Sequence, residues 1–205
     1  MDTPGQTLDD VTSQPPDDEG FKSQSSVRSI IEWVVIVAGA VLVAVIIRTF
    51  VLQAFYIPSS SMEPTLKIDD KVLVNKLSYK FHDINRGDIV VFERPPGETD
   101  PKIKDLIKRV IGLPGDTLVF KDCSVFIDGK RLDEPYVDQQ CTDPPQNAVD
   151  PDGDGSVTVP DGMLFVMGDN RGGSFDSRYF GAITEHSVVG RAFVIMWPIG
   201  DWAWL

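Results

Sequence analysis

The chain has 205 residues, of which 42% are hydrophobic and 24% are charged, and its net charge is −12. This length and apolar share are sufficient for one or two small domains with a packed core. The acidity argues against nucleic acid as a partner, because a DNA or RNA binder presents a basic surface to phosphate groups.

Residues 1–28 form an acidic, polar segment with six acids and two bases. Asp, Ser, Gln, Pro and Gly dominate this segment, which holds too little apolar surface to offset the entropy lost on ordering. We therefore expect a disordered tail. Lys22 and Arg28 favour a cytoplasmic position for it, because basic residues gather on the cytoplasmic side of a membrane span.

Residues 29–49 are predicted to be a single transmembrane anchor. Ile30 to Ile47 is apolar except for Glu32, and a helix needs about 20 such residues to cross the hydrocarbon core. A buried helix of a soluble protein would show a polar face, which this segment lacks. A cleaved signal peptide would have a basic start and a shorter apolar core, whereas the start here is long and acidic.

Residues 50–205 carry a β pattern of short segments rich in Val, Ile and Phe and bounded by Gly, Pro or Asp. The predicted strands are Lys71–Lys76, Asp88–Glu93, Leu106–Ile111, Thr117–Lys121, Ser124–Ile127, Met163–Met167 and Val188–Trp197. Asp128-Gly129 is typical of a two-residue hairpin turn, and one helical turn is expected near Thr184–Ser187. The fold class is therefore mainly β, an antiparallel barrel-like or sandwich-like domain. The stretch 137–160, rich in Asp, Pro and Gly, is predicted to be an inserted surface loop.

The chain has two cysteines, Cys123 and Cys141. They form no C-x-x-C motif or Cys/His cluster, so we predict no metal site and no cofactor. In an oxidising compartment the pair could form a disulfide, and otherwise they are two unrelated thiols. The sequence leaves this choice open.

Four segments combine polar or charged residues with apolar runs, namely Ile57–Leu66, Arg86–Phe92, Leu106–Asp116 and Gly168–Gly181. Each has an ordinary structural explanation when taken alone. The first is a serine cluster that could be a solvated turn. The second is a turn that leads into a buried strand, and the fourth is a polar loop after an apolar strand.

The Lys-Arg pair in the third segment carries chemistry. On a strand, alternate side chains share a face, so Lys108 lies with Val110 and Arg109 with Ile111. Burial lowers the pKa of a lysine and makes a neutral amine available near neutral pH, whereas arginine stays charged and cannot act as a base. The alternative is that both side chains extend to solvent from a half-exposed strand.

Taken together, in this order and behind a single anchor, the four segments resemble the conserved boxes of bacterial type I signal peptidases. These enzymes are serine proteases with a lysine general base, and the resemblance covers Ser29–Trp197 in outline. It implies that Ser61, which precedes Met62, is the nucleophile and that Lys108 is the general base. It also implies an oxyanion-hole hydroxyl on Ser59, beside the backbone N–H of Ser61.

The fourth segment supplies the remaining roles implied by the resemblance. Ser174 matches the serine that hydrogen-bonds and orients the lysine, and Asp176 and Arg178 match a structural ion pair near the site. Two departures stand out: Ser60 occupies a position where glycine is common, and Gly172-Gly173 replaces a common Asp-Asn. The glycine pair leaves Ser174 in place but could loosen the loop that holds it.

The resemblance implies preprotein signal peptides and the lipid bilayer as partners, with the catalytic domain outside the cytoplasm. The family recognises small residues at the first and third positions before the cut. Two alternatives stay open, a maturation peptidase of the same family with few clients and an inactive membrane-anchored domain that binds peptides. The oligomeric state is not predicted.

Overall fold

The computed structural model describes residues 23–98, 100–101, 103–121, 124–137 and 155–205. Most of the predicted tail, the centre of the predicted loop and both cysteines lie outside these residues. The chain divides into two units, Met1–Val45 and Ile46–Leu205, which are taken separately below.

The first unit contains the helix α1, Ser23–Ile46, except for its last residue. Within it, Val27–Ile46 is long and apolar enough to cross a bilayer, with 20 residues and a mean hydropathy of 2.6. Its side chains are exposed. The predicted N-terminal apolar helix is therefore present. It ends three residues earlier than predicted, because the backbone changes to a π-helical turn at Ile47–Val51.

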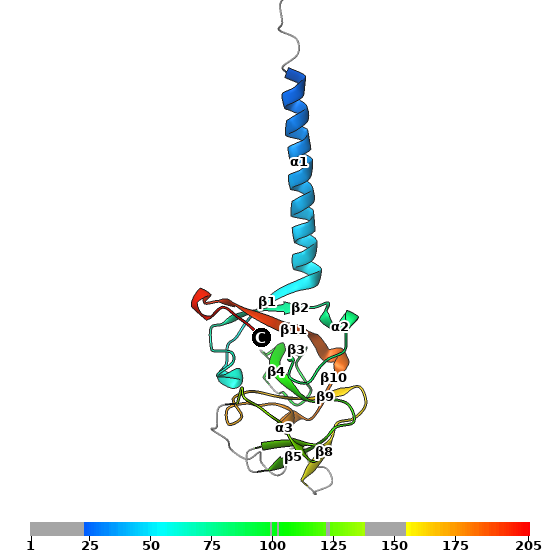
Figure 1. Ribbon diagram of the computed structural model, residues 1–205, viewed down its shortest axis with the longest axis vertical. Coiled ribbons are helices and arrows are strands. Elements are labelled where there is room, and N and C mark those ends of the chain that lie inside the picture. Colours follow the sequence, from blue (N-terminus) through cyan, green and yellow to red (C-terminus); the bar gives the residue numbers. More distant parts are fainter. Residues whose placement is uncertain (1–22, 99, 102, 122–123, 138–154) are drawn as a thin grey trace, which may run out of the picture. The chain divides into compact units, whose positions relative to one another are not determined.

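The regular secondary structure of the second unit is mainly antiparallel strands (Figure 1). The strands are β1 Leu52–Tyr56, β2 Lys71–Asn75, β3 Ile89–Glu93, β4 Asp105–Gly112, β5 Thr117–Lys121, β6 Ser124–Ile127, β7 Lys130–Arg131, β8 Ser156–Thr158, β9 Met163–Met167, β10 Ile183–Thr184, β11 Val188–Trp197 and β12 Ala203–Trp204. The short helices are α2 Ser78–Phe81 and α3 Ser177–Phe180, and 3-10 turns cover Ser60–Met62, Glu185–Ser187 and Ile199–Asp201.

The larger sheet has the strand order β1-β2-β11-β3-β4-β9-β10, with β12 paired to β11. Its central strand β3 is buried on both faces. Ile89 and Val91 belong to one apolar cluster, and Val90 and Phe92 belong to another. A strand covered on both sides needs a continuous apolar run rather than an alternating one, which is the pattern of this segment.

The smaller sheet has the order β7-β6-β5-β8 and packs on a third apolar cluster. β6 and β7 are joined by Asp128-Gly129, whose φ angles of 50° and 76° are the positive pair that a two-residue hairpin turn of type I′ requires. Gly112 ends β4 beside this cluster. A Cβ there would lie 2.9 Å from side-chain atoms of Leu118, Val159 and Phe165, so only glycine permits this packing.

The predicted fold class, mainly β and antiparallel behind one apolar helix, is confirmed. Four predicted strands have the bounds of β5, β6, β9 and β11. The prediction that residues 137–160 form only a loop was wrong at one end, because Ser156–Thr158 is β8 and pairs with β5. A three-residue strand has too few positions to show a period, so the partner strand decides it.

Candidate active site

The segment that carries Ser61 is held by three apolar side chains. Ile57, Met62 and Leu66 are each no more than 2% exposed and insert into the cluster beneath β2 and β11. The segment closes on itself through a backbone bond of 2.9 Å from Ile57 N to Asp70 O. Ser61 lies in the 3-10 turn between these anchors and is 8% exposed. Burial of Met62 therefore fixes the backbone of the preceding serine.

Lys108 reaches Ser61 from the middle of β4. Its Nζ donates to Ser61 Oγ over 2.8 Å and to the carbonyl oxygen of Ile107 over 3.0 Å. The side chain is 4% exposed, and its β4 residue pairs with Val90 of β3. Burial lowers the pKa of the amine from 10.5 to about 8, although the carboxylates of Asp176, Glu98 and Asp169 raise it.

The other two predicted serines lie on either side of this pair. Ser59 Oγ is 3.3 Å from Ser61 Oγ, and Ser59 is exposed. Ser174 is 5% exposed, and its Oγ makes no hydrogen bond within the described part of the chain, so the predicted bond to Lys108 is absent. A Cβ on Gly168 would lie 2.3 Å from both Ser174 Oγ and Ser61 O, which puts Ser174 beside the nucleophile's backbone.

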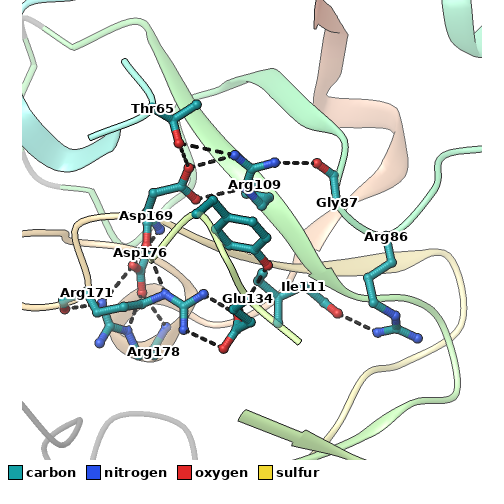
Figure 2. Close-up of polar contacts among 12 residues, drawn as sticks. Thr65, Arg86, Gly87, Arg109, Ile111, Glu134, Asp169, Arg171, Asp176 and Arg178 are labelled. Carbon is teal, nitrogen blue, oxygen red and sulfur yellow. Dashed lines mark hydrogen bonds and ion pairs between the residues drawn. The ribbon is translucent and has the colours of Figure 1, made fainter. Parts of the chain in front are cut away.

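Asp176 and Arg178 form an ion pair that is almost inaccessible to solvent. Two guanidinium nitrogens of Arg178 donate to the carboxylate over 2.8 and 2.9 Å. Asp176 also accepts from the backbone N–H of Gly168, and Arg178 donates to the carbonyl oxygen of Arg171. Figure 2 shows Asp176, Arg178 and Arg171 close together, with their contacts as dashed lines. The pair therefore joins the two ends of the loop that contains Ser174.

A second, partly buried ion pair joins the strand of Lys108 to the same loop. Arg109 donates to both carboxylate oxygens of Asp169 over 2.8 and 2.7 Å, and Thr65 Oγ1 donates to one of them over 2.5 Å (Figure 2). The guanidinium also lies 3.9 Å from the ring centroid of Tyr136. Of the two cations in the Lys-Arg pair, Arg109 is therefore paired with a carboxylate, whereas Lys108 has no carboxylate bonded to it among the described residues.

A third pair joins Arg171 to Glu134 in two contacts, and Arg171 Nε also donates to Gly168 O over 3.1 Å (Figure 2). Sequence reasoning missed Asp169, Arg171 and Glu134 as partners. One signal was available, because an arginine whose strand neighbours are apolar on both faces needs a carboxylate when it is buried. The sequence did not indicate which carboxylate.

The geometry supports one kind of chemistry. A buried amine with a lowered pKa that contacts a serine hydroxyl can accept the hydroxyl proton and make the oxygen a nucleophile. His82 and His186 are exposed and lie outside the segments around Ser61 and Lys108. The site is thus that of a serine hydrolase built on an antiparallel β domain.

Comparison with known proteins gives the family. Residues 30–197 match the family described as "Signal peptidase, peptidase S26". A "Probable signal peptidase I-2" of Synechocystis is 45% identical over 78% of this chain and 70% of its own length. A "Signal peptidase I" of Leptolyngbya laminosa is 38% identical over 93% of this chain and 92% of its own. A crystal structure of a signal peptidase I from Enterococcus faecalis shares 36% identity over 54% of this chain and 97% of that chain, with a TM-score of 0.42.

The chain belongs to the signal peptidase family, peptidase S26. It is accordingly a serine protease, a hydrolase of the signal peptidase I type. The family predicted from the four segments is confirmed.

Proposed function

We propose that this chain is a membrane-bound endopeptidase that removes N-terminal signal peptides from secreted preproteins, with Ser61 as nucleophile and Lys108 as general base. The observation that carries the proposal is the 2.8 Å contact between the Lys108 amine and the Ser61 hydroxyl, with both side chains buried. A serine hydroxyl is a weak nucleophile unless a neighbouring base accepts its proton. That base must be available in its neutral form, and a pKa lowered to about 8 gives Lys108 a substantial neutral fraction near neutral pH.

The reaction proceeds through an acyl-enzyme. Ser61 Oγ attacks the scissile carbonyl carbon while its proton passes to Lys108 Nζ, and a tetrahedral oxyanion forms. The carbon–nitrogen bond then breaks, and Lys108 returns the proton to the leaving amine. Lys108 next takes a proton from a water molecule that attacks the ester carbon. The bond from that carbon to Ser61 Oγ then breaks, Lys108 returns the proton to Ser61 Oγ, and the acid product leaves. The Ser61 N–H and the hydroxyl of Ser59, 3.3 Å from Ser61 Oγ, stabilise the oxyanion.

Ser174 is proposed to orient the lysine. Its buried hydroxyl has no hydrogen-bond partner within the described residues, and an unpaired buried hydroxyl costs roughly 1–3 kcal/mol. A bond from the Lys108 amine would remove this cost and hold the amine in line with Ser61. Ser174→Ala should then lower kcat and shift the pH midpoint of kcat/KM. A lower kcat with an unchanged midpoint would contradict the role.

The helix Val27–Ile46 is proposed as the membrane anchor, with the peptidase domain outside the cytoplasm. Its length and hydropathy of 2.6 suit a span of about 30 Å. The C-terminal turn has exposed aromatic side chains on Trp202 (55% exposed) and Trp204 (69% exposed), and tryptophan is enriched at membrane–water interfaces. We propose that these two residues contact lipid. Trp fluorescence that does not respond to added vesicles would contradict this contact.

The decisive experiment is cleavage of a preprotein with small residues at the first and third positions before the cut, by the full chain in detergent. Lys108→Met should lower kcat by about 10²–10⁴-fold, the contribution of general-base catalysis. Lys104→Met is the matched control, because this lysine is exposed just before β4. Cleavage by Lys108→Met at the wild-type rate would refute the proposed base. No cleavage by the wild type would favour an enzyme with few clients or an inactive peptide-binding domain.

A further inference from the structure

Asn170 contacts both peptide groups that flank Ser61. Its backbone N–H donates to Ser61 O over 3.2 Å, and its side-chain Nδ2 donates to Ser60 O over 3.1 Å. The orientation of the side-chain amide is defined by a third contact, in which Gly173 N donates to Asn170 Oδ1 over 3.1 Å. The Ser60 carbonyl can only accept and the Gly173 N–H can only donate, so the NH₂ group faces Ser60 and Oδ1 faces Gly173.

The carbonyl that Asn170 holds belongs to the same peptide group as the Ser61 N–H. A trans peptide is planar and directs its C=O and N–H to opposite sides. The Ser60 carbonyl also accepts from Glu63 N over 3.0 Å, so two donors fix this plane from its carbonyl side. Donation to a carbonyl also polarises the peptide and makes its N–H a stronger donor.

We propose that Asn170 is a positioning residue that orients the Ser60–Ser61 peptide, so that the Ser61 N–H is already aimed at the oxyanion. The inference rests on the proposed function, in which that N–H is an oxyanion-hole donor. Preorganised donors contribute most when they do not have to move during the reaction, and an unrestrained turn would have to move. Asn170 does not touch the substrate carbonyl, and it acts through the peptide that does.

Gly173 makes this arrangement possible. A Cβ at this position would lie 2.8 Å from Asn170 Nδ2 and 3.1 Å from its Cγ. A side chain there would push the amide away from Ser60. The sequence left open whether the glycine pair at positions 172 and 173 loosens the loop. Gly173 N donates to both the backbone O and the side-chain Oδ1 of Asn170, each over 3.1 Å.

The test compares Asn170→Ala and Gly173→Ala with wild type, as full chains in detergent. Asn85→Ala is the matched control, because Asn85 Nδ2 also donates to a backbone carbonyl, that of Asp83, over 3.2 Å. Removing an oxyanion donor outright costs about 10²–10³-fold in kcat, so misaiming one should cost about 10–100-fold. KM should change by less than about twofold, because the interaction belongs to the transition state. The control should match wild type.

Two further measurements separate positioning from a merely structural role. A peptide aldehyde with small residues at its first and third positions forms a tetrahedral adduct with the serine, and its affinity should fall by the same factor as kcat. An uncleavable peptide of the same sequence should bind as before. The pH midpoint of kcat/KM should also stay in place, because Lys108 keeps its surroundings.

The outcomes distinguish this inference from the proposed function. If Ser61→Ala is inactive while Asn170→Ala keeps wild-type kcat and aldehyde affinity, the positioning role is refuted and the Ser61–Lys108 pair stands. If Asn170→Ala weakens both ligands equally and unfolds at a much lower temperature, Asn170 is structural and the inference is also refuted. If Ser61→Ala retains activity, the proposed function and this inference both fail.

Discussion

Replacing Lys108 by methionine should change how the stability of the protein depends on pH. Methionine has nearly the same length as lysine and carries no charge, so the variant removes one titrating group from a buried site. Lys108 is 4% exposed, and burial is the main reason that its pKa is lowered to about 8 in the folded chain. In the unfolded chain the amine regains its ordinary value of 10.5.

The size of the effect follows from the difference between these two pKa values. Because the folded pKa is the lower one, the folded chain binds fewer protons than the unfolded chain between pH 8 and 10.5, and wild-type stability rises with pH in that window. One pKa unit corresponds to about 1.4 kcal/mol. Between about pH 6.5 and about pH 9.5 the wild type should therefore gain about 2 kcal/mol relative to Lys108→Met.

The assay is denaturant unfolding of the full chain in detergent, followed by tryptophan fluorescence at a series of pH values. Methionine also cannot replace the two hydrogen bonds of the amine, to Ser61 Oγ and Ile107 O. We treat that loss as the same at every pH. The change with pH in the difference between the two unfolding free energies then reports the titration of the Lys108 amine alone. Lys104→Met is the control, because it removes the charge of an exposed lysine just before β4.

A constant difference between wild type and Lys108→Met across this pH range would refute the reasoning. It would mean that the amine has the same proton affinity in the folded and unfolded chains. Lys108 would then have almost no neutral amine near neutral pH, too little to serve as the base for the serine proton. A difference that grows in the opposite direction would mean that the neighbouring carboxylates outweigh burial.

Three further predictions concern the site and the loop that supports it. The kcat/KM for preprotein cleavage should rise with pH to a midpoint near 8, because the neutral amine of Lys108 is the active form; a rate profile that is flat there would exclude it as the base. Asp176→Asn should lower the free energy of unfolding by about 3–5 kcal/mol, because it leaves a buried guanidinium without its counter-ion. Urea unfolding at neutral pH measures this loss, and a clearly smaller loss would contradict the prediction. Gly168→Ala should lower kcat by about 10²-fold, because misplacement near the chemistry is costly and the new Cβ would lie 2.3 Å from Ser61 O. Gly200→Ala, where a Cβ meets nothing within 4 Å, should leave kcat unchanged in the same cleavage assay.

Much of the fold could be predicted from the sequence, because its signals are local. The apolar helix follows from an uninterrupted run of apolar residues between Trp33 and Ile47. The bounds of β5, β6, β9 and β11 follow from short apolar runs between turn residues, and the Asp128-Gly129 turn follows from its residue types. Each of these signals depends on neighbours within a few positions along the chain.

The resemblance assigned Ser61, Lys108, Ser59 and Ser174 to the site, and their roles are still proposals. What the sequence could not supply was the partner of each buried charge. Arg109 lies 60 positions from Asp169, and Arg171 lies 37 positions from Glu134. Nothing local in a chain specifies a contact across such distances, since it depends on strand order and on the path of the loops.

The sequence by itself determined the fold class, the apolar helix and the family, because each of these is written in residue types and short spacings. Only the tertiary structure decided that Lys108 bonds to the Ser61 hydroxyl while the adjacent Arg109 bonds to a carboxylate, and that the amide of Asn170 holds the Ser60 carbonyl. Both depend on how β4 and the 168–178 loop pack around the nucleophile's turn. Burial sets the pKa of a catalytic group and hydrogen bonding sets its orientation. Burial and hydrogen bonding arise only in the folded chain.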